Sequence, residues 1–294
     1  MKPGKVEKYM RKRIKEDGAI LLALIDPDKQ PFEKGAKMAE IAYECGADVI
    51  LVGGSIGAQG IILDKTTKLI RDKVDIPIVL FPGNIGTITP YADAIEFMFL
   101  MNSSDVYWLS TAQIQSAPVI KKMGLEVIPT AYIILEPGQA AGWVSQANLI
   151  PRNRPDLAAA TALAGEYVGV HMIVMDSGSG APEPVAPEFI ATVKKYISIP
   201  LIYGGGCRTP EQVREFVKAG ADGIQIGTAF ELVEKDEQKA REKIKAMVKA
   251  VKDGGEEKKT NEENNKEKEN IHKPLIKKLP RFLRFSFKKK ANGK

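Results

Sequence analysis

Short apolar segments recur along the chain and alternate with segments in which apolar and charged residues are mixed. The apolar segments are rich in β-branched residues and nearly free of charge, which is typical of strands that are buried on both faces. Between them, stretches such as PFEKGAKMAEIAYECG and TPEQVREFVKAG place apolar residues at helical spacing. The apolar segments cover residues 19–26, 47–54, 76–83, 94–100, 125–136, 169–176, 199–205 and 223–228.

Strands that alternate with helices in this way predict a parallel sheet with helical crossovers. Eight such units predict a (β/α)₈ TIM barrel over residues 1–253. A doubly wound open sheet is the alternative, because strands are easily miscounted from sequence. The similarity between GADVILVGG (46–54) and GADGIQIGT (220–228) favours the barrel, although Gly-Ala-Asp is also common where a helix leads into a strand.

The chain changes character after residue 253. Residues 254–270, GGEEKKTNEENNKEKEN, are polar and of low complexity, so we expect a disordered linker. Residues 271–294 carry nine Lys or Arg and no acid, interleaved with leucine, isoleucine and phenylalanine. This composition is typical of a segment that lies on an anionic membrane surface; an unstructured solubilising tail is the alternative.

Charge and cysteine usage narrow the class of protein. The net charge of +6 comes from the tail, because residues 1–270 sum to −3, so we expect no nucleic-acid partner. Cys45 and Cys207 lie far apart and form no CxxC, which indicates neither a disulfide framework nor a zinc site and fits a reducing, cytosolic setting. The charged N-terminus and the lack of a long uncharged apolar run predict neither a signal peptide nor a spanning helix.

The ends of the last two predicted strands indicate a phosphate site, since binding residues of a parallel barrel lie at the carboxyl ends of its strands. The seventh strand runs into YGGGCRTPEQV and the eighth into IGTAF. Gly204, Gly205 and Gly206 let a phosphate approach the backbone closely, and Thr228 adds a hydroxyl. Glycines that only form tight turns are the alternative explanation.

The sixth predicted strand ends in VMDSGSGAP (174–182), next to this phosphate site. Residues 177–180 would supply backbone amides and hydroxyls to the same phosphorylated molecule, which leaves Asp176 as the acid near its alcohol groups. The loop therefore predicts a polyol phosphate as ligand. Alternatively, Asp176 caps the loop through local backbone hydrogen bonds.

The first two strands end in LIDPDK and VGGS. Asp26 and Ser55 would project into the same mouth and form a partial oxygen shell for Mg²⁺, whose other ligands are commonly waters and substrate phosphates. A single carboxylate suggests that the metal arrives with a diphosphate, to which Lys29 could add a positive charge. An Asx-Pro turn around Asp26 and Asp28 is the alternative.

Several motifs are absent from the sequence, namely Walker A, the Rossmann GxGxxG and the DDxxD of helical prenyl-chain synthases. His171 and His272 are the only histidines, so we do not expect histidine-based catalysis. His171 lies within a predicted strand and is interpreted as a structural residue of the barrel.

Six motifs together, LIDPDK (24–29), VGGS (52–55), FPGN (81–84), SGSGAP (177–182), YGGG (203–206) and IGT (226–228), resemble the geranylgeranylglyceryl phosphate synthases of archaea. The wider family includes bacterial heptaprenylglyceryl phosphate synthases. The resemblance spans residues 1 to about 250 and implies a modified TIM barrel. Such an enzyme joins sn-glycerol 1-phosphate to geranylgeranyl diphosphate with Mg²⁺, and so forms the first ether bond of archaeal membrane lipids. Related enzymes form dimers or hexamers.

Carried over by position, the resemblance implies that Asp26 and Ser55 hold Mg²⁺ on the prenyl diphosphate. The residues it places around sn-glycerol 1-phosphate are Val174, Met175, Asp176, Ser177, Gly178, Ser179, Gly180, Gly205, Gly206, Gly227 and Thr228. Many relatives read Tyr-Leu-Glu where this chain reads Val174-Met175-Asp176, so a phenolic hydroxyl is missing there and the acid is one methylene shorter. We expect Asp176 to serve as the catalytic base nonetheless.

Residues 132–155, YIILEPGQAAGWVSQANLIPRNRP, are too long for an ordinary loop after the fifth strand. Their apolar residues suggest a subunit contact anchored by Trp143, or alternatively a cover over the prenyl groove. Tyr107 and Trp108 are candidates for the end of that groove, with core packing as the alternative. Two other functions stay open: a phosphate-binding barrel isomerase or lyase, and a barrel that binds polyol phosphate or prenyl lipid without turnover.

Overall fold

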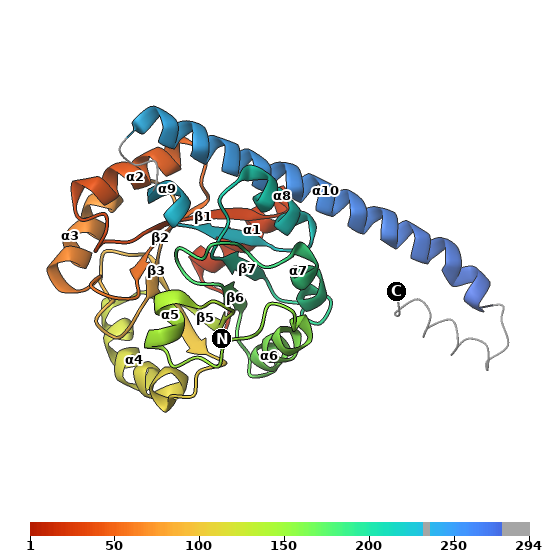
Figure 1. Cartoon of the computed structure of the whole chain (residues 1–294), viewed down its shortest axis with the longest axis horizontal. Helices are drawn as coiled ribbons and strands as arrows, with labels where there is room; N and C mark the ends of the chain where they lie inside the picture. The colour runs from red at the N-terminus through yellow and green to blue at the C-terminus, as the bar shows by residue number, and fades with distance from the viewer. Residues whose placement is uncertain (232–235, 278–294) are drawn as a thin grey trace.

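The computed structural model describes residues 1–231 and 236–277. Its eight parallel strands pair in sequence order and close into a barrel, which confirms the predicted TIM barrel (Figure 1). The strands are β1 (Ile20–Ile25), β2 (Val49–Gly54), β3 (Ile78–Pro82), β4 (Ala94–Leu100), β5 (Glu126–Ile134), β6 (Met172–Asp176), β7 (Leu201–Gly204) and β8 (Gly223–Ile226).

Helices surround this barrel, as expected from the alternating pattern. They are α1 (Lys5–Asp17), α2 (Glu33–Glu44), α3 (Gly60–Arg71), a π-helical turn η1 (Tyr107–Thr111) that leads into α4 (Ala112–Met123), α5 (Gln139–Val144), α6 (Pro155–Tyr167), α7 (Pro187–Lys194), α8 (Pro210–Lys218), α9 (Thr228–Glu231) and α10 (Glu237–Lys277). Residues 83–93, between β3 and β4, contain no helix. The outer face of the barrel is therefore less covered there than elsewhere.

Successive side chains of each strand belong alternately to two apolar layers, one inside the barrel and one outside it. Leu22, Leu51 and Ile202 lie with the inward-facing cluster, whereas Ala23, Ile50 and Tyr203 lie with the cluster that packs under the surrounding helices. Both faces of the strands are thus buried, which explains why the sequence shows continuous apolar runs instead of strict alternation.

Carboxylates at the amino-terminal ends of three strands bind the backbone of the preceding strand. Asp48, Asp93 and Asp222 accept hydrogen bonds from the amides of Leu21, Ile78 and Leu201 at 2.8–2.9 Å. The two Gly-Ala-Asp segments of the sequence therefore share a structural cause: an aspartate that fixes strand register at the bottom of the barrel.

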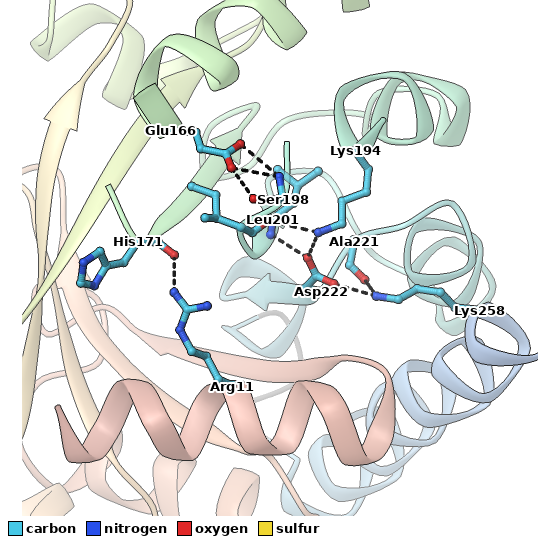
Figure 2. A network of polar contacts seen from close by, with 10 residues as sticks. Arg11, Glu166, His171, Lys194, Ser198, Leu201, Ala221, Asp222 and Lys258 are labelled. Atoms are coloured by element: carbon cyan, nitrogen blue, oxygen red, sulfur yellow. Dashed lines mark hydrogen bonds and ion pairs between the residues drawn. The ribbon is translucent and has the colours of Figure 1, made fainter. Parts of the chain in front are cut away.

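The Asp222 carboxylate also binds two lysines from different helices (Figure 2). Lys194 of α7 lies 2.5 Å from one oxygen and Lys258 of α10 lies 2.8 Å from the other. Lys258 is buried and also donates to the carbonyl oxygen of Ala221 at 3.1 Å. This network ties α10 to the bottom of the barrel.

Residues 254–270, for which the sequence predicts a disordered linker, are helical in the described chain, where α10 continues through them to Lys277. Gly254 and Gly255 do not end the helix. A Cβ at Gly255 would lie 2.0 Å from the carbonyl oxygen of Asp17, so the glycine allows α10 to pass close to the end of α1. Beyond this contact the helix extends away from the barrel (Figure 1).

The predicted tail, residues 271–294, lies outside the described residues from 278 onward. The membrane contact expected of this tail stays a prediction. Among the described helices, none has an apolar stretch long enough to cross a bilayer.

Candidate active site

Asp176 ends β6 with its carboxylate held by two donors. The amide of Gly178 donates to Oδ1 at 2.7 Å, and the hydroxyl of Tyr132 donates to Oδ2 at 2.9 Å. Burial raises the pKa of Asp176, while both hydrogen bonds oppose that shift. The alternative of a loop-capping carboxylate is thus correct for Oδ1, but Asp176 also lines the central cavity.

Glycines shape the loops that follow β6 and β7. Gly178, Gly180, Gly205 and Gly206 all have positive φ, between 78° and 93°. At Gly205 a Cβ would also lie 2.7 Å from Oδ1 of Asp176. All four positions favour glycine for their backbone conformation, and Gly205 also requires it for the close approach to the acid.

The structure brings most of the predicted site residues to one cavity at the carboxyl ends of the strands, which we call the mouth pocket. It is lined by Asp26, Ser55, Asp176, Ser179, Gly180, Gly205, Gly206, Gly227 and Thr228 among others. The hydroxyl groups of Ser179 and Thr228, both in this lining, are hydrogen-bonded to each other at 3.0 Å. The β1, β2, β6, β7 and β8 ends therefore converge as predicted.

Five predicted residues do not line the mouth pocket: Lys29, described below, and four residues at the end of β6. Val174 faces the barrel interior and Met175 packs in the outer layer under the helices. The Ser177 hydroxyl is buried against that of Tyr203, at 3.1 Å. Gly178 contributes the amide that holds Asp176. These four residues therefore support the site without lining it.

Asp26 lines the same pocket as Ser55, and one of its carboxylate oxygens forms an ion pair with Lys29. Lys29 Nζ is 2.9 Å from Oδ2, whereas Oδ1 is buried without a hydrogen-bond partner in the described chain. Burial, together with the neighbouring Asp28, raises the pKa of Asp26 to about 8, although Lys29 opposes the shift. A Cβ at Gly54 would lie 2.1 Å from Oδ1, so glycine is needed there.

Lys29 is not itself part of the pocket lining, but its side chain contacts two residues that are, Asp26 and Ser179. Its ammonium group lies 3.4 Å from Ser179 Oγ and 3.4 Å from a carboxylate oxygen of Glu231. The lysine thus bridges the loops after β1, β6 and β8.

An apolar groove opens from the mouth pocket toward β3 and β4, with η1 and α4 on its outer side. Its first part is lined by Phe81, Tyr132, Ala141 and Val144, and Pro82, Met98, Leu100 and Trp108 continue into the second part with Ile85, Ile88 and Ile120. Trp108 therefore lines the groove, which is one of the two roles that the sequence suggested for it. Tyr107 does not line it, but its ring packs edge-on against Trp108 at 4.9 Å.

Sequence reasoning missed Tyr132 and Arg208. Tyr132 lies in the middle of an apolar run, where nothing in the pattern separates it from a core aromatic. Arg208 lines the mouth pocket and donates to the carbonyl oxygen of Ala181 at 3.0 Å. Its position directly after the Gly-Gly-Gly-Cys segment was the available signal.

His171 lies at the other end of β6 from Asp176. Its Nδ1 is 2.8 Å from a carboxylate oxygen of Glu7, and its carbonyl oxygen accepts from Arg11 at 3.0 Å (Figure 2). The interpretation of His171 as a structural residue is confirmed by this placement.

Comparison with known proteins gives consistent matches. The family model described as the PcrB family matches residues 11–251. The geranylgeranylglyceryl phosphate synthase of Pyrococcus furiosus is 48% identical over 251 residues, or 85% of this chain and 99% of that protein. The enzyme of the same name from Thermococcus kodakarensis is 46% identical over 252 residues, which cover 86% of this chain and 99% of that protein.

Solved structures agree with these matches. The (S)-3-O-geranylgeranylglyceryl phosphate synthase of Thermoplasma acidophilum, solved in complex with its substrate sn-glycerol 1-phosphate, superposes with a TM-score of 0.77 at 34% identity, covering 83% of this chain and 98% of that one. The family match covers most of the chain, and the relatives are matched over nearly their full length. This chain therefore belongs to the PcrB family.

Proposed function

We propose that this chain is a prenyltransferase that joins sn-glycerol 1-phosphate to geranylgeranyl diphosphate, with Mg²⁺ as its metal, and releases diphosphate. The observation that carries the proposal is the junction of the mouth pocket with the apolar groove, which share Phe81 and Tyr132. The mouth pocket can hold a small phosphate ester and the apolar groove can hold a long apolar chain, so that the two molecules meet at the junction. The names of the relatives, and the sn-glycerol 1-phosphate bound to the Thermoplasma enzyme, support this assignment.

The glycerol phosphate is assigned to the glycine-rich side of the mouth pocket. The loops around Gly180, Gly205, Gly206 and Gly227 leave room for a phosphate against the backbone, and Ser179 and Thr228 add hydroxyl groups. Arg208 at the edge adds a positive charge suited to a phosphate. This arrangement leaves the glycerol hydroxyl groups toward Asp176.

The residues at β1 and β2 fit a magnesium ion. Asp26 and Ser55 offer oxygen ligands, and the buried Oδ1 of Asp26 has no partner among the described residues. No group of three or more acidic, histidine or cysteine side chains suited to a metal occurs in residues 1–231 and 236–277. We therefore assign the remaining ligands to the diphosphate and water, with Lys29 as a further contact to the diphosphate. A bound Mg²⁺ would stabilise the negative charge of the departing diphosphate.

The chain's own groups account for the rest of the reaction. The oxygen of the glycerol 3-hydroxyl forms a bond to the first carbon of the prenyl chain, and Asp176 takes the proton of that hydroxyl. The bond between this carbon and the diphosphate oxygen breaks, and its electron pair leaves with the diphosphate. The groove holds the apolar chain so that this carbon lies at the junction. Anchoring both substrates in one cavity supplies much of the rate enhancement.

The proposed function is tested by incubating the protein with Mg²⁺, radiolabelled sn-glycerol 1-phosphate and prenyl diphosphates of increasing length. We expect label to enter an organic-extractable product, with the 3-phosphate enantiomer as a poor substrate. Asp176→Ala should lower kcat by about 10²–10⁴-fold, because the general base is lost. Asp156→Ala, which removes an exposed aspartate of α6, is the matched control and should keep the parental rate.

Two results would contradict this assignment. Asp176→Ala with parental turnover would remove Asp176 from the chemistry. No extractable label with any prenyl donor, despite tight binding of glycerol phosphate, would instead favour a binding protein or a barrel enzyme with another reaction.

We also propose that the protein forms a homo-oligomer, a dimer or a hexamer, through the segment that contains α5. Trp143 of α5 is 83% exposed, while its neighbours Ala141 and Val144 line the groove. An exposed tryptophan of this kind is typical of an interface anchor. A cover over the groove is the alternative role for Trp143.

A further inference from the structure

Tyr132 is a buried tyrosine of β5 whose hydroxyl reaches the proposed base. In the barrel register it lies opposite Leu100 of β4 and Val174 of β6, both of which belong to the inward-facing cluster. Its ring meets that of Phe81 edge-on, with centroids 5.4 Å apart. Packing on both sides therefore fixes the position of the hydroxyl group.

Each carboxylate oxygen of Asp176 accepts one hydrogen bond from the protein. Gly178 donates to Oδ1 and Tyr132 donates to Oδ2, at 2.7 and 2.9 Å. A carboxylate oxygen has two lone pairs, so each oxygen can still accept a proton from a substrate hydroxyl. The two donors together set the plane of the carboxylate.

We infer that Tyr132 is the positioning residue for proton transfer, because its hydroxyl holds Oδ2 of Asp176 and so orients the carboxylate toward the glycerol hydroxyl. This inference rests on the proposed function. Tyr132 lines both the mouth pocket and the groove, so it stands where the glycerol oxygen and the first prenyl carbon must meet. Phe81 keeps the ring in place without offering a polar atom.

The electrostatics agree with a donor role for Tyr132. Burial and the nearby Asp176 hold the pKa of Tyr132 well above its ordinary value, so the phenol stays protonated and does not replace Asp176 as base. The hydrogen bond from Tyr132 lowers the pKa of Asp176 against the effect of burial. Removing the hydroxyl should therefore raise the pKa of Asp176 and shift activity to higher pH.

The test is Tyr132→Phe, which deletes the hydroxyl and keeps the ring. We expect the acid limb of the pH profile of kcat/KM to move up by about one pH unit, which is about a tenfold loss on that limb, with much smaller loss above it. Calorimetric affinity for sn-glycerol 1-phosphate at high pH should stay near the parental value, because the glycine-rich loops bind the phosphate.

Tyr203→Phe is the matched control. Tyr203 is also fully buried, but its hydroxyl lies 3.1 Å from Ser177 Oγ and accepts from the amide of Val185 at 3.0 Å. Its loss should weaken glycerol phosphate binding by loosening the loop and leave the acid limb in place.

A parental pH profile for Tyr132→Phe would overturn the inference, and so would an equal loss at every pH, which would assign Tyr132 to packing alone. If the parental protein forms no product, the proposed function fails. The inference is then still tested by the pH dependence of glycerol phosphate binding, which should shift in Tyr132→Phe and not in Tyr203→Phe.

Discussion

Glu96 is an acid of the barrel wall with nothing to compensate its burial. It lies on β4 between the inward-facing Ala94 and Met98, and it is 0% exposed. Neither carboxylate oxygen has a hydrogen-bond partner in the described chain. Burial raises the pKa of Glu96 to about 8, so the side chain is protonated at neutral pH.

This acid should make stability depend on pH. Below the ordinary glutamate pKa both folded and unfolded chains hold the proton, and Glu96 costs nothing extra. Between about pH 4.5 and 8 the unfolded chain releases the proton while the folded chain keeps it, so the free energy of unfolding falls as pH rises.

Glu96→Gln removes this titration and should stabilise the protein by about 2–4 kcal/mol more at pH 8 than at pH 5. Urea unfolding at the two pH values measures the difference. Equal effects of the substitution at both values would show that Glu96 is ionised, or paired, in the folded protein.

At the scale of elements, α10 is held to the barrel by buried polar contacts as well as apolar ones. The outer core includes Ile244, Met247 and Val251 of this helix. About two turns after Val251, Lys258 is buried and pairs with Asp222. The helix therefore contributes to the domain beyond residue 253, where composition alone suggested that the domain ends.

Lys258→Met should lower the free energy of unfolding by about 1–3 kcal/mol, because it removes a buried partner of Asp222 while Lys194 remains. Lys249→Met is the control: that lysine pairs with Asp253 with its side chain 74% exposed and should change stability by no more than about 0.5 kcal/mol. Urea denaturation compares them. Equal effects of the two substitutions would contradict a role for Lys258 in holding α10.

At the scale of the whole molecule, the assembly proposed here depends on Trp143. Trp143→Glu should reduce the particle mass measured by light scattering, since a charge would replace an apolar anchor of the subunit contact. If the mass is unchanged and the KM for the prenyl diphosphate rises, Trp143 covers the groove instead. A parental protein that is monomeric in solution would exclude the proposed contact.

Much of the architecture could be predicted from the sequence. The continuous apolar runs reflect strands buried on both faces, and the strand ends at Asp26, Asp176 and Gly205 converge because all parallel strands of a barrel end on one side. Local pattern and parallel topology are enough for both conclusions.

Two features of the structure have physical causes that composition does not reveal. The polar stretch after residue 253 has few apolar residues to hold it against the barrel. A buried ion pair with a residue far away in the sequence can do so instead, and Lys258 forms such a pair with Asp222. Tyr132 and Glu96 lie in strands that are apolar on average, and only the closed barrel determines which side chains meet in its interior.

The sequence by itself determined the eightfold repeat of strand and helix, the glycine-rich loops after β6 and β7 and the family resemblance, because these depend on short segments and their order. Only the tertiary structure decided that Tyr132 of β5 donates to Asp176 of β6, that an apolar groove adjoins the mouth pocket near the ends of β3 and β4, and that α10 binds the barrel through Lys258. Those contacts join residues of different strands and helices, and their geometry follows from barrel closure and from desolvation, which act on the folded molecule as a whole.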